Sequence, residues 1–196
     1  MKKILLLVVG LITSQAFAQF TLSGELRPRA EYRNGYKTLT ADNSEAALFV
    51  SQRTRINSQF VSENYTFFVS VQDVRVWGDV PQLNTSDLNG LAIHEAWGQI
   101  KFSSDFGVKL GRQEIIYDDS RIFGNVGWAQ QARSHDAMIA KFKTSEKSNL
   151  DLGFALNADS QAGVDNLYSN VAGYKTFQYA WFHTKASKLG ISLLAL

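Results

Sequence analysis

Residues 20–34 read FTLSGELRPRAEYRN and alternate between two kinds of side chain. One set is mostly apolar or small and comprises Phe20, Leu22, Gly24, Leu26, Pro28, Ala30 and Tyr32. The other set is polar or charged and comprises Thr21, Ser23, Glu25, Arg27, Arg29, Glu31 and Arg33. Because successive side chains of a β-strand point to opposite faces, this stretch predicts a strand with one apolar and one charged face.

Residues 48–60 repeat the alternation. The apolar face comprises Leu48, Val50, Ile56 and Phe60 together with Thr54. The polar face comprises Ser51, Arg53, Arg55, Asn57 and Gln59. Further strands are predicted at 65–77, 91–102, 106–114, 135–143, 150–157, 175–185 and 190–196. Short turns at 62–64, 103–105 and 145–148 alternate with longer polar stretches, which is typical of a transmembrane β-barrel.

The first 18 residues predict a cleaved signal peptide. Lys2 and Lys3 precede an apolar run at 4–12, and Ala16 and Ala18 form a small-x-small cleavage site, so the mature chain is expected to begin at Gln19. The apolar run is shorter than the roughly 20 residues of a membrane-spanning helix, which excludes a helical inner-membrane protein. Residues 19–196 are then the N-terminal portion of a single barrel domain in the outer membrane of a Gram-negative bacterium.

Composition narrows the classes of protein further. The absence of cysteine excludes a lipid-anchored lipoprotein, a disulfide framework and a thiolate metal site, and no cofactor or metal is expected. The chain has 20 basic and 18 acidic residues, and the excess of two is supplied by Lys2 and Lys3. A balanced mature charge and export across the inner membrane exclude nucleic acid as a partner.

A soluble β-sandwich or lipocalin-like barrel is the alternative fold, since it also alternates apolar and polar residues. Aromatic residues at the strand ends favour the transmembrane barrel, because they match the girdles that such barrels place at the membrane interfaces. These residues are Phe20, Tyr32, Phe60, Tyr65, Phe102 and Phe106. Nine strands are an odd number and residues 190–196 end without a turn, so we expect further strands to close the barrel.

The centre of the chain resembles a known family. Gly111-Arg112-Gln113-Glu114, then Asp118, Arg121, Gly124, Trp128, Gln131 and the run at 133–137, are similar to the signature region of the alginate export porins. Residues 72–79 also resemble that family, and the likeness covers about 21–142. It implies an all-β, single barrel of about eighteen strands whose lumen is lined by arginines and passes a polyuronate. By this resemblance the matched arginines are Arg75, Arg112 and Arg133, with Asp73, Asp118 and Asp136 as acidic partners.

Arginines in a barrel interior are suited to attract anions. A guanidinium keeps its charge at every relevant pH and presents a planar fork of donors to a carboxylate. The predicted pore-lining residues are Arg27, Arg53, Arg55, Arg75, Arg112, Arg121, Arg133, Asp73, Asp118 and Asp136, with Leu22, Leu26, Val50 and Ile56 facing lipid. The alternative is that the arginines only form salt bridges that pack the interior or hold a plug. Residues 118–134 are interpreted as an inward-folded loop that constricts the pore, or else as an ordinary surface loop.

Enzyme readings find no support in the sequence, and no catalytic residues are predicted. His94, His135 and His183 lie far apart, and no zinc-protease, nucleophile-elbow or dinucleotide motif is present. Ser134, His135 and Asp136 are neighbours on a predicted strand, so they cannot converge as a triad. The expected function is an anion-selective channel, with a general porin for small anions or a non-conducting barrel (an adhesin or enzyme scaffold) as alternatives. The expected partners are outer-membrane lipid, an anionic polysaccharide or small anion, and export proteins of the periplasm.

Overall fold

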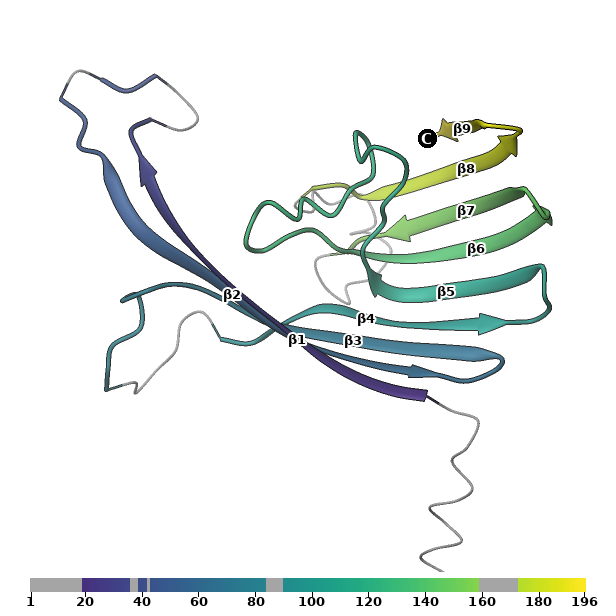
Figure 1. The fold of residues 1–196 in the computed structure, drawn as a ribbon, viewed down its shortest axis with the longest axis horizontal. Coiled ribbons are helices and arrows are strands. Elements are labelled where there is room, and N and C mark those ends of the chain that lie inside the picture. The colour runs from purple at the N-terminus through teal and green to yellow at the C-terminus, as the bar shows by residue number, and fades with distance from the viewer. Residues whose placement is uncertain (1–18, 36–38, 42, 84–89, 159–172) are drawn as a thin grey trace, which may run out of the picture.

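The computed structural model describes residues 19–35, 39–41, 43–83, 90–158 and 173–196, so the predicted signal peptide lies outside the described residues. These ranges contain β1 (Gln19–Arg33), β2 (Ala47–Val61), β3 (Tyr65–Val76), β4 (Ala92–Lys101), β5 (Phe106–Gln113), β6 (His135–Ser145), β7 (Ser148–Leu156), β8 (Thr176–Ala186) and β9 (Leu189–Ala195). The strands form one antiparallel sheet in chain order (Figure 1). Each predicted strand is confirmed, with ends that differ by at most two residues. In the described part of the chain, no helix is long and apolar enough to span a membrane.

Connections at one end of the sheet are short and those at the other end are long. The short turns join β2 to β3, β4 to β5, β6 to β7 and β8 to β9, and we call this side the short-turn end. The long-loop end carries the connections at 34–46, 77–91, 114–134 and 157–175. Every strand therefore runs from one end to the other, as the alternation of turns and loops predicts.

Strand register assigns each side chain to one of two faces. Arg27 pairs with Arg53 and Arg53 pairs with Val74, so these residues share a face, which we call the inner face. Leu26 pairs with Thr54 on the opposite, outer face. The residues predicted to face lipid, Leu22, Leu26, Val50 and Ile56, all lie on the outer face. Leu22 and Leu26 are 65% and 68% exposed, so within the described ranges the apolar face is open at these two positions.

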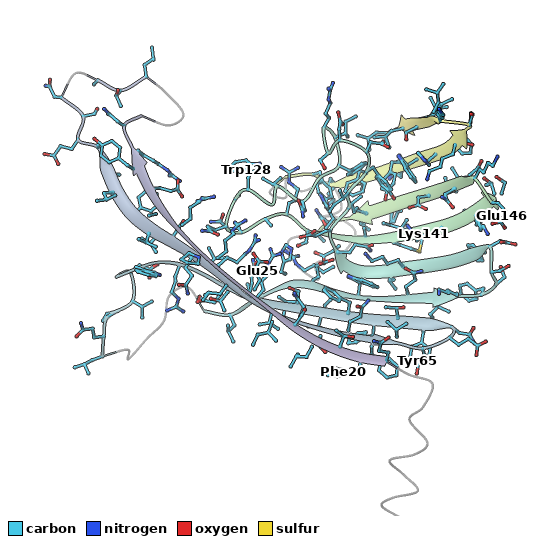
Figure 2. All side chains as sticks on the ribbon, viewed as in Figure 1. Phe20, Glu25, Tyr65, Trp128, Lys141 and Glu146 are labelled. Carbon is cyan, nitrogen blue, oxygen red and sulfur yellow. The ribbon has the colours of Figure 1, made fainter. Side chains whose placement is uncertain are left out.

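Aromatic rings form a band along the short-turn end of the outer face. Phe60 stacks on Tyr65 with ring centroids 5.6 Å apart, and Phe106 stacks on both Phe102 and Phe142 at 5.4 and 4.8 Å. Phe20 pairs with Phe60 across β1 and β2, and Figure 2 shows Phe20 and Tyr65 at the same end of the sheet. This is the arrangement that the aromatic positions in the sequence predict for a membrane girdle.

The buried core lies on the inner face, beneath the connection between β5 and β6. Ile115 and Phe123 of that connection pack on Ala137, Ile139, Ala155 and Tyr179 of β6 to β8. Gly153 makes this packing possible, because a Cβ at its position would lie only 2.0 Å from the ring of Tyr179. The connection at 114–134 is therefore an inward-folded loop, named the inner loop below, and it reaches from β5 toward β1 and β2 before returning to β6 (Figure 1).

Candidate functional site

Aromatic and acidic groups fix one side of the inner loop to β7 and β8. The hydroxyl of Tyr117 donates to Asp151 Oδ2 at 2.8 Å and lies 3.0 Å from the hydroxyl of Tyr179. Burial, the hydrogen bond with Tyr179 and the charge of Asp151 raise the pKa of Tyr117 above its usual range. The phenol therefore stays neutral and keeps its proton for Asp151, which also accepts from Lys141 Nζ at 2.6 Å.

Arginines of β1 and β2 hold the other side of the inner loop. Arg27 donates to the carbonyl oxygens of Gly127 and Ala129 at 2.6 and 2.9 Å, and to Gln130 Oε1 at 2.8 and 3.1 Å. Arg53 contacts the carbonyls of Ala129 and Gln130 at 3.4 and 3.3 Å. Because one planar guanidinium can satisfy several carbonyls at once, two side chains are sufficient to fix the backbone of 127–130.

Gln130 completes this attachment from the loop side. Its side chain is only 5% exposed, and its amide donates to the carbonyl and hydroxyl oxygens of Ser51 at 3.1 and 2.9 Å. Gln131, the next residue of the loop, is also attached to the sheet, because Gln72 of β3 donates to its carbonyl at 3.1 Å. The inner loop therefore bridges the inner face from β8 to β1.

Carboxylates lie between the arginines of β1 and β2. Glu25 accepts from Arg53 at 2.6 Å, and Glu31 pairs with both Arg29 and Arg33 at 2.7 Å. These pairs are only partly exposed, so each carboxylate offsets part of the positive potential and keeps its arginine extended. The inner face at β1 and β2 is thus basic, and carboxylates neutralise part of its positive charge.

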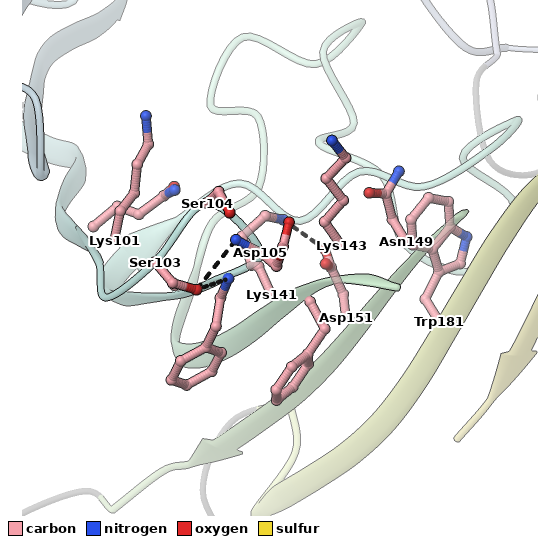
Figure 3. A pocket seen from close by; sticks show the side chains of 13 residues that line it. Lys101, Ser103, Ser104, Asp105, Lys141, Lys143, Asn149, Asp151 and Trp181 are labelled. Carbon is pink, nitrogen blue, oxygen red and sulfur yellow. Dashed lines mark hydrogen bonds and ion pairs between the residues drawn. The ribbon is translucent and has the colours of Figure 1, made fainter. Parts of the chain in front are cut away.

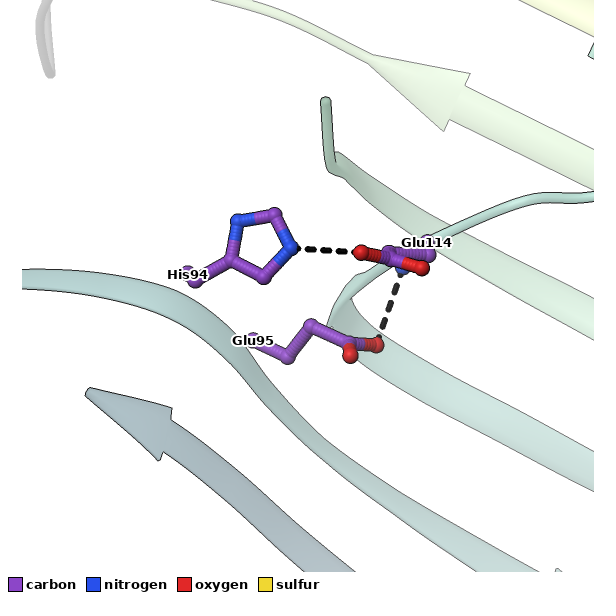
Figure 4. A group of neighbouring side chains, drawn as sticks. All are labelled: His94, Glu95 and Glu114. Atoms are coloured by element: carbon purple, nitrogen blue, oxygen red, sulfur yellow. Dashed lines mark hydrogen bonds and ion pairs between the residues drawn. The ribbon is translucent and has the colours of Figure 1, made fainter. Parts of the chain in front are cut away.

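A polar cluster of buried His94 and partly buried Glu95 and Glu114 lies at the base of the inner loop (Figure 4). The register of β3 and β4 shifts at Ser70 and Val71, and the extra residue in β4 is His94, which is 3% exposed. His94 Nε2 lies 2.7 Å from Glu114 Oε1, and Glu95 accepts the backbone N–H of Glu114 at 3.0 Å. A bulge of this kind redirects side chains, and here it brings His94 and Glu95 to the same side of the strand.

The charge of Glu114 is stabilised despite its burial. Burial alone would raise the pKa of this carboxyl, but hydrogen bonds from His94 and Asn125 and the charge of Arg55 outweigh it, so the pKa is lowered. One ligand atom each from His94, Glu95 and Glu114 lie within 4.8 Å of one another, a set that could hold a divalent metal ion. Arg55 Nη1 lies 3.8 Å from Glu114, and this guanidinium already supplies the positive charge that a metal would bring.

A hollow opens on the inner face at each end of the sheet. One, of about 520 Å³, lies at the long-loop end between β1 to β3 and the inner loop, and its lining includes Arg29, Glu31, Arg33, Phe49, Arg75 and Trp128. The other, of about 350 Å³, lies at the short-turn end and is shown in Figure 3. Its lining includes Lys101, Asp105, Lys141, Lys143, Asp151 and Trp181. Both hollows combine basic groups with carboxylates and an aromatic ring.

Comparison with known protein families identifies the chain. The model of the alginate export family matches residues 18–165, which is most of the chain. The protein belongs to the alginate export family. A search of curated proteins found no match. The family is one of outer-membrane porins, and the all-β antiparallel sheet of this member has the fold expected for part of such a barrel.

In this alginate export protein, three of the predicted pore-lining arginines lie together on the inner face. Arg27, Arg53 and Arg55 come from paired positions of β1 and β2, and Arg53 and Arg55 are buried. Arg27 and Arg53 hold the inner loop, and Arg55 donates to Gln72 Oε1 at 2.9 Å. The sequence leaves open that the arginines hold a plug inside the barrel. The contacts of Arg27 and Arg53 with the inner loop are of that kind.

Four other predicted pore-lining residues lie on the opposite face, and their predicted orientation is wrong. Asp73 and Arg75 pair with Thr54 and Gln52, which belong to the outer face, and form an ion pair of 2.6 Å. Arg112 pairs with Asp136 across β5 and β6, also on the outer face, with 3.0 Å between the charged groups. The physical reason is the two-residue period, which gives the outer face to these positions whatever their charge.

The remaining predicted residues lie in the inner loop. Asp118 accepts a hydrogen bond from Trp181 Nε1 at 3.0 Å, and contacts with Ser192 and Trp181 lower the pKa of this carboxyl. Arg121 is exposed and pairs with Asp119 at 2.6 Å. Arg133 is exposed, and its backbone N–H donates to the carbonyl of Asn125. Asp118, Arg121 and Arg133 therefore stand apart from the arginines of β1 and β2.

Several residues of the site carry no clear signal in the sequence. Arg29 was visible as a strand residue of the charged face, and its Nη1 donates to the carbonyl of Trp128 at 2.5 Å. Gln130, Tyr117 and Glu114 were not predicted as site residues, although each fixes the inner loop. The two-residue period places Arg29 on the charged face of a strand. No local sequence pattern indicates that Gln130, Tyr117 and Glu114 fix the inner loop.

Proposed function

We propose that the inner face lines the pore of an outer-membrane channel for an anionic polysaccharide of the uronate type. The observation that carries this proposal is the distribution of strand charges between the two faces. Basic residues of the inner face include Arg27, Arg29, Arg33, Arg53, Arg55, Lys101, Lys109, Lys141 and Lys143. Its carboxylates are Glu25, Glu31, Glu95 and Asp151, whereas the described outer face carries only the two ion pairs at Arg75 and Arg112.

An excess of basic groups over carboxylates suits the passage of a polyanion. The fixed positive charges raise the local concentration of anions in a narrow, low-dielectric passage. The carboxylates at Glu25 and Glu31 limit how tightly any one site binds, and conduction needs binding that is weak and distributed. Membership of the alginate export family agrees with a polymer of acidic sugars as the transported solute.

The inner loop is the proposed constriction of this pore. It crosses the inner face between β8 and β1, and its contacts with Arg27, Arg53 and Ser51 hold it there. The path that remains passes the two hollows, one at each end of the sheet. Lipid is the proposed partner of the outer face, and export proteins of the periplasm are the proposed partners of the short-turn end.

The test is the ion selectivity of the intact protein in a planar bilayer. Replacing Arg29 and Lys101 by glutamine removes two inner-face charges outside the buried core. Anion-over-cation permeability is expected to fall by about fivefold, the factor that corresponds to about 1 kcal/mol of Coulomb energy. The measurement belongs near 0.1 M salt, because screening at higher salt would mask the difference.

Arg112→Gln is the matched control, because it removes an arginine of the outer face. It is expected to leave selectivity unchanged. Equal selectivity of the double variant and the wild type would mean that the inner-face charges are structural. A folded protein without any conductance would instead favour the non-conducting barrel.

A further inference from the structure

Trp128 is an exposed tryptophan at the tip of the inner loop. Its side chain is 68% exposed, and Figure 2 shows it on the part of the loop that reaches toward β1 and β2. The surrounding backbone is fixed, since Arg29 Nη1 donates to the carbonyl of Trp128 at 2.5 Å and Ala129 N–H donates to the carbonyl of Val126 at 2.9 Å. The indole is therefore held in place through its main chain while its ring stays open.

The two other tryptophans on the inner face have covered rings. Trp97 stacks on Phe68 at 5.4 Å and carries Lys109 Nζ 3.9 Å from its centroid. Trp181 stacks on Tyr117 at 4.6 Å and on His183 at 5.5 Å. Among the described residues, no aromatic ring or cation covers Trp128 in this way. The ring of Trp128 is therefore available for contact, and an aromatic ring offers a large apolar area to a ligand.

The ring borders a hollow with the chemistry of a sugar-acid site. The hollow of about 520 Å³ is lined by the basic residues Arg29 and Arg33 and by the acidic residues Glu31 and Asp79. Guanidinium groups recognise carboxylates, and carboxylates and amides accept from sugar hydroxyls. The face of an indole is electron-rich, so it attracts the weakly positive C–H groups on one side of a pyranose ring. A small inorganic anion would use the arginines but not the indole.

We propose that the indole of Trp128 is a stacking surface for a pyranose ring of the transported polymer, with the charged groups of the adjoining hollow holding its carboxylate and hydroxyls. This inference rests on the proposed function, because it names how the same pore recognises its solute. It assigns Trp128 to the recognition of sugar rings and leaves the selection of charge to the basic residues. The two properties can therefore be separated by substitution.

The experiment measures block of the ion current by a hexameric oligouronate, using the intact protein in a planar bilayer. Trp128→Ala is expected to raise the half-blocking concentration by about tenfold, the upper range for one aromatic contact. Trp128→Leu should weaken the block similarly because it is apolar but not aromatic, and Trp128→Phe should keep most of it. Chloride-over-potassium selectivity should be unchanged in all three variants, because the indole carries no charge.

Trp77→Ala is the matched control. Trp77 is also exposed, at 59%, but its Nε1 donates to Gln52 of the outer face, so its replacement should leave the block unchanged. Folding of each variant is checked by its heat-modifiable migration in electrophoresis. If Trp128→Ala and Trp128→Leu fold and block like the wild type, the stacking surface is refuted while the proposed function stands. If the oligouronate fails to block the wild type, both the uronate channel and the stacking surface are refuted.

Discussion

Single arginines in this protein act as connectors between distant parts of the chain. Arg27 binds Gly127, Ala129 and Gln130, which lie about a hundred residues away in sequence. A lysine could not replace it, because an ammonium group lacks the rigid fork that reaches several carbonyls in one plane. A residue that the sequence marks as a charge for solute is therefore also a ligand for the protein's own backbone.

A substitution at Gly153 tests how the inner loop packs on β7 and β8. In Gly153→Ala the new methyl group would overlap the ring of Tyr179, whose hydroxyl contacts Tyr117 of the loop. Overpacking of this kind is expected to lower the free energy of unfolding by about 1–3 kcal/mol, measured in urea on the protein refolded into lipid vesicles. Gly98→Ala is the control, since its methyl group would lie 4.0 Å from the nearest atom and should be nearly neutral. Equal effects of the two substitutions would contradict the packing of Tyr179 on Gly153.

The sequence predicts where the strands lie along the chain better than it predicts which distant residues contact one another. All nine strands follow from the two-residue alternation and from the turn residues. The same alternation also placed Arg75 after Phe67, Val69, Val71 and Asp73, and Arg112 after Phe106, Val108 and Leu110. Counting by two from the aromatic residue would have assigned both arginines to the outer face. The charge and the family resemblance of both arginines indicate a pore lining, but neither of them reports which face a strand position occupies, so the predicted orientation is wrong.

The contacts of the inner loop had no comparable signal. Nothing in residues 127–131 specifies that their carbonyls meet Arg27, Arg53 and Gln72, because backbone acceptors are the same in every residue. The glycines and polar residues of 118–134 predicted a loop, and its inward fold was one of two alternatives. The structure decides between them through the packing of Phe123 on Tyr179, with ring centroids 4.6 Å apart.

Adjacent positions of β2 test the assignment of the faces. Ile56 lies on the outer face and Asn57 on the inner face, in the middle of the strand. Ile56→Arg is expected to cost about 2–4 kcal/mol of folding free energy in lipid vesicles, because its charge would enter the hydrocarbon. Asn57→Arg should have a much smaller effect, since its side chain faces a polar interior. Similar losses for the two variants in the same urea titration would contradict the two-faced sheet.

The whole protein is expected to lose its signal peptide and to reside in the outer membrane. We expect the signal peptide to be removed after Ala18, so that the mature protein begins with Gln19, the first residue of β1. N-terminal sequencing of protein recovered from the outer-membrane fraction with detergent checks both points. Recovery of folded mature protein from the periplasm without detergent would contradict the outer-membrane location.

The Asp73–Arg75 ion pair of the outer face indicates how far the apolar surface of β3 extends. On β3, the distance from Tyr65 in the aromatic band to Asp73 in the ion pair is eight residues, or about 26 Å along the strand. A strand tilt of about 40° reduces this to about 20 Å, close to the height of the apolar belt of an outer-membrane barrel. Leu26 of β1 lies level with Asp73 through Thr54, and β1 continues to Arg33 beyond it. The upper part of the β1–β2 hairpin projects past the other strands in Figure 1, and Val50, paired with Ala30, and Tyr32 continue the apolar outer face there. We therefore expect Glu31 and Arg33, on either side of Tyr32, to lie near the headgroup level, where a polymer would enter or leave the proposed channel.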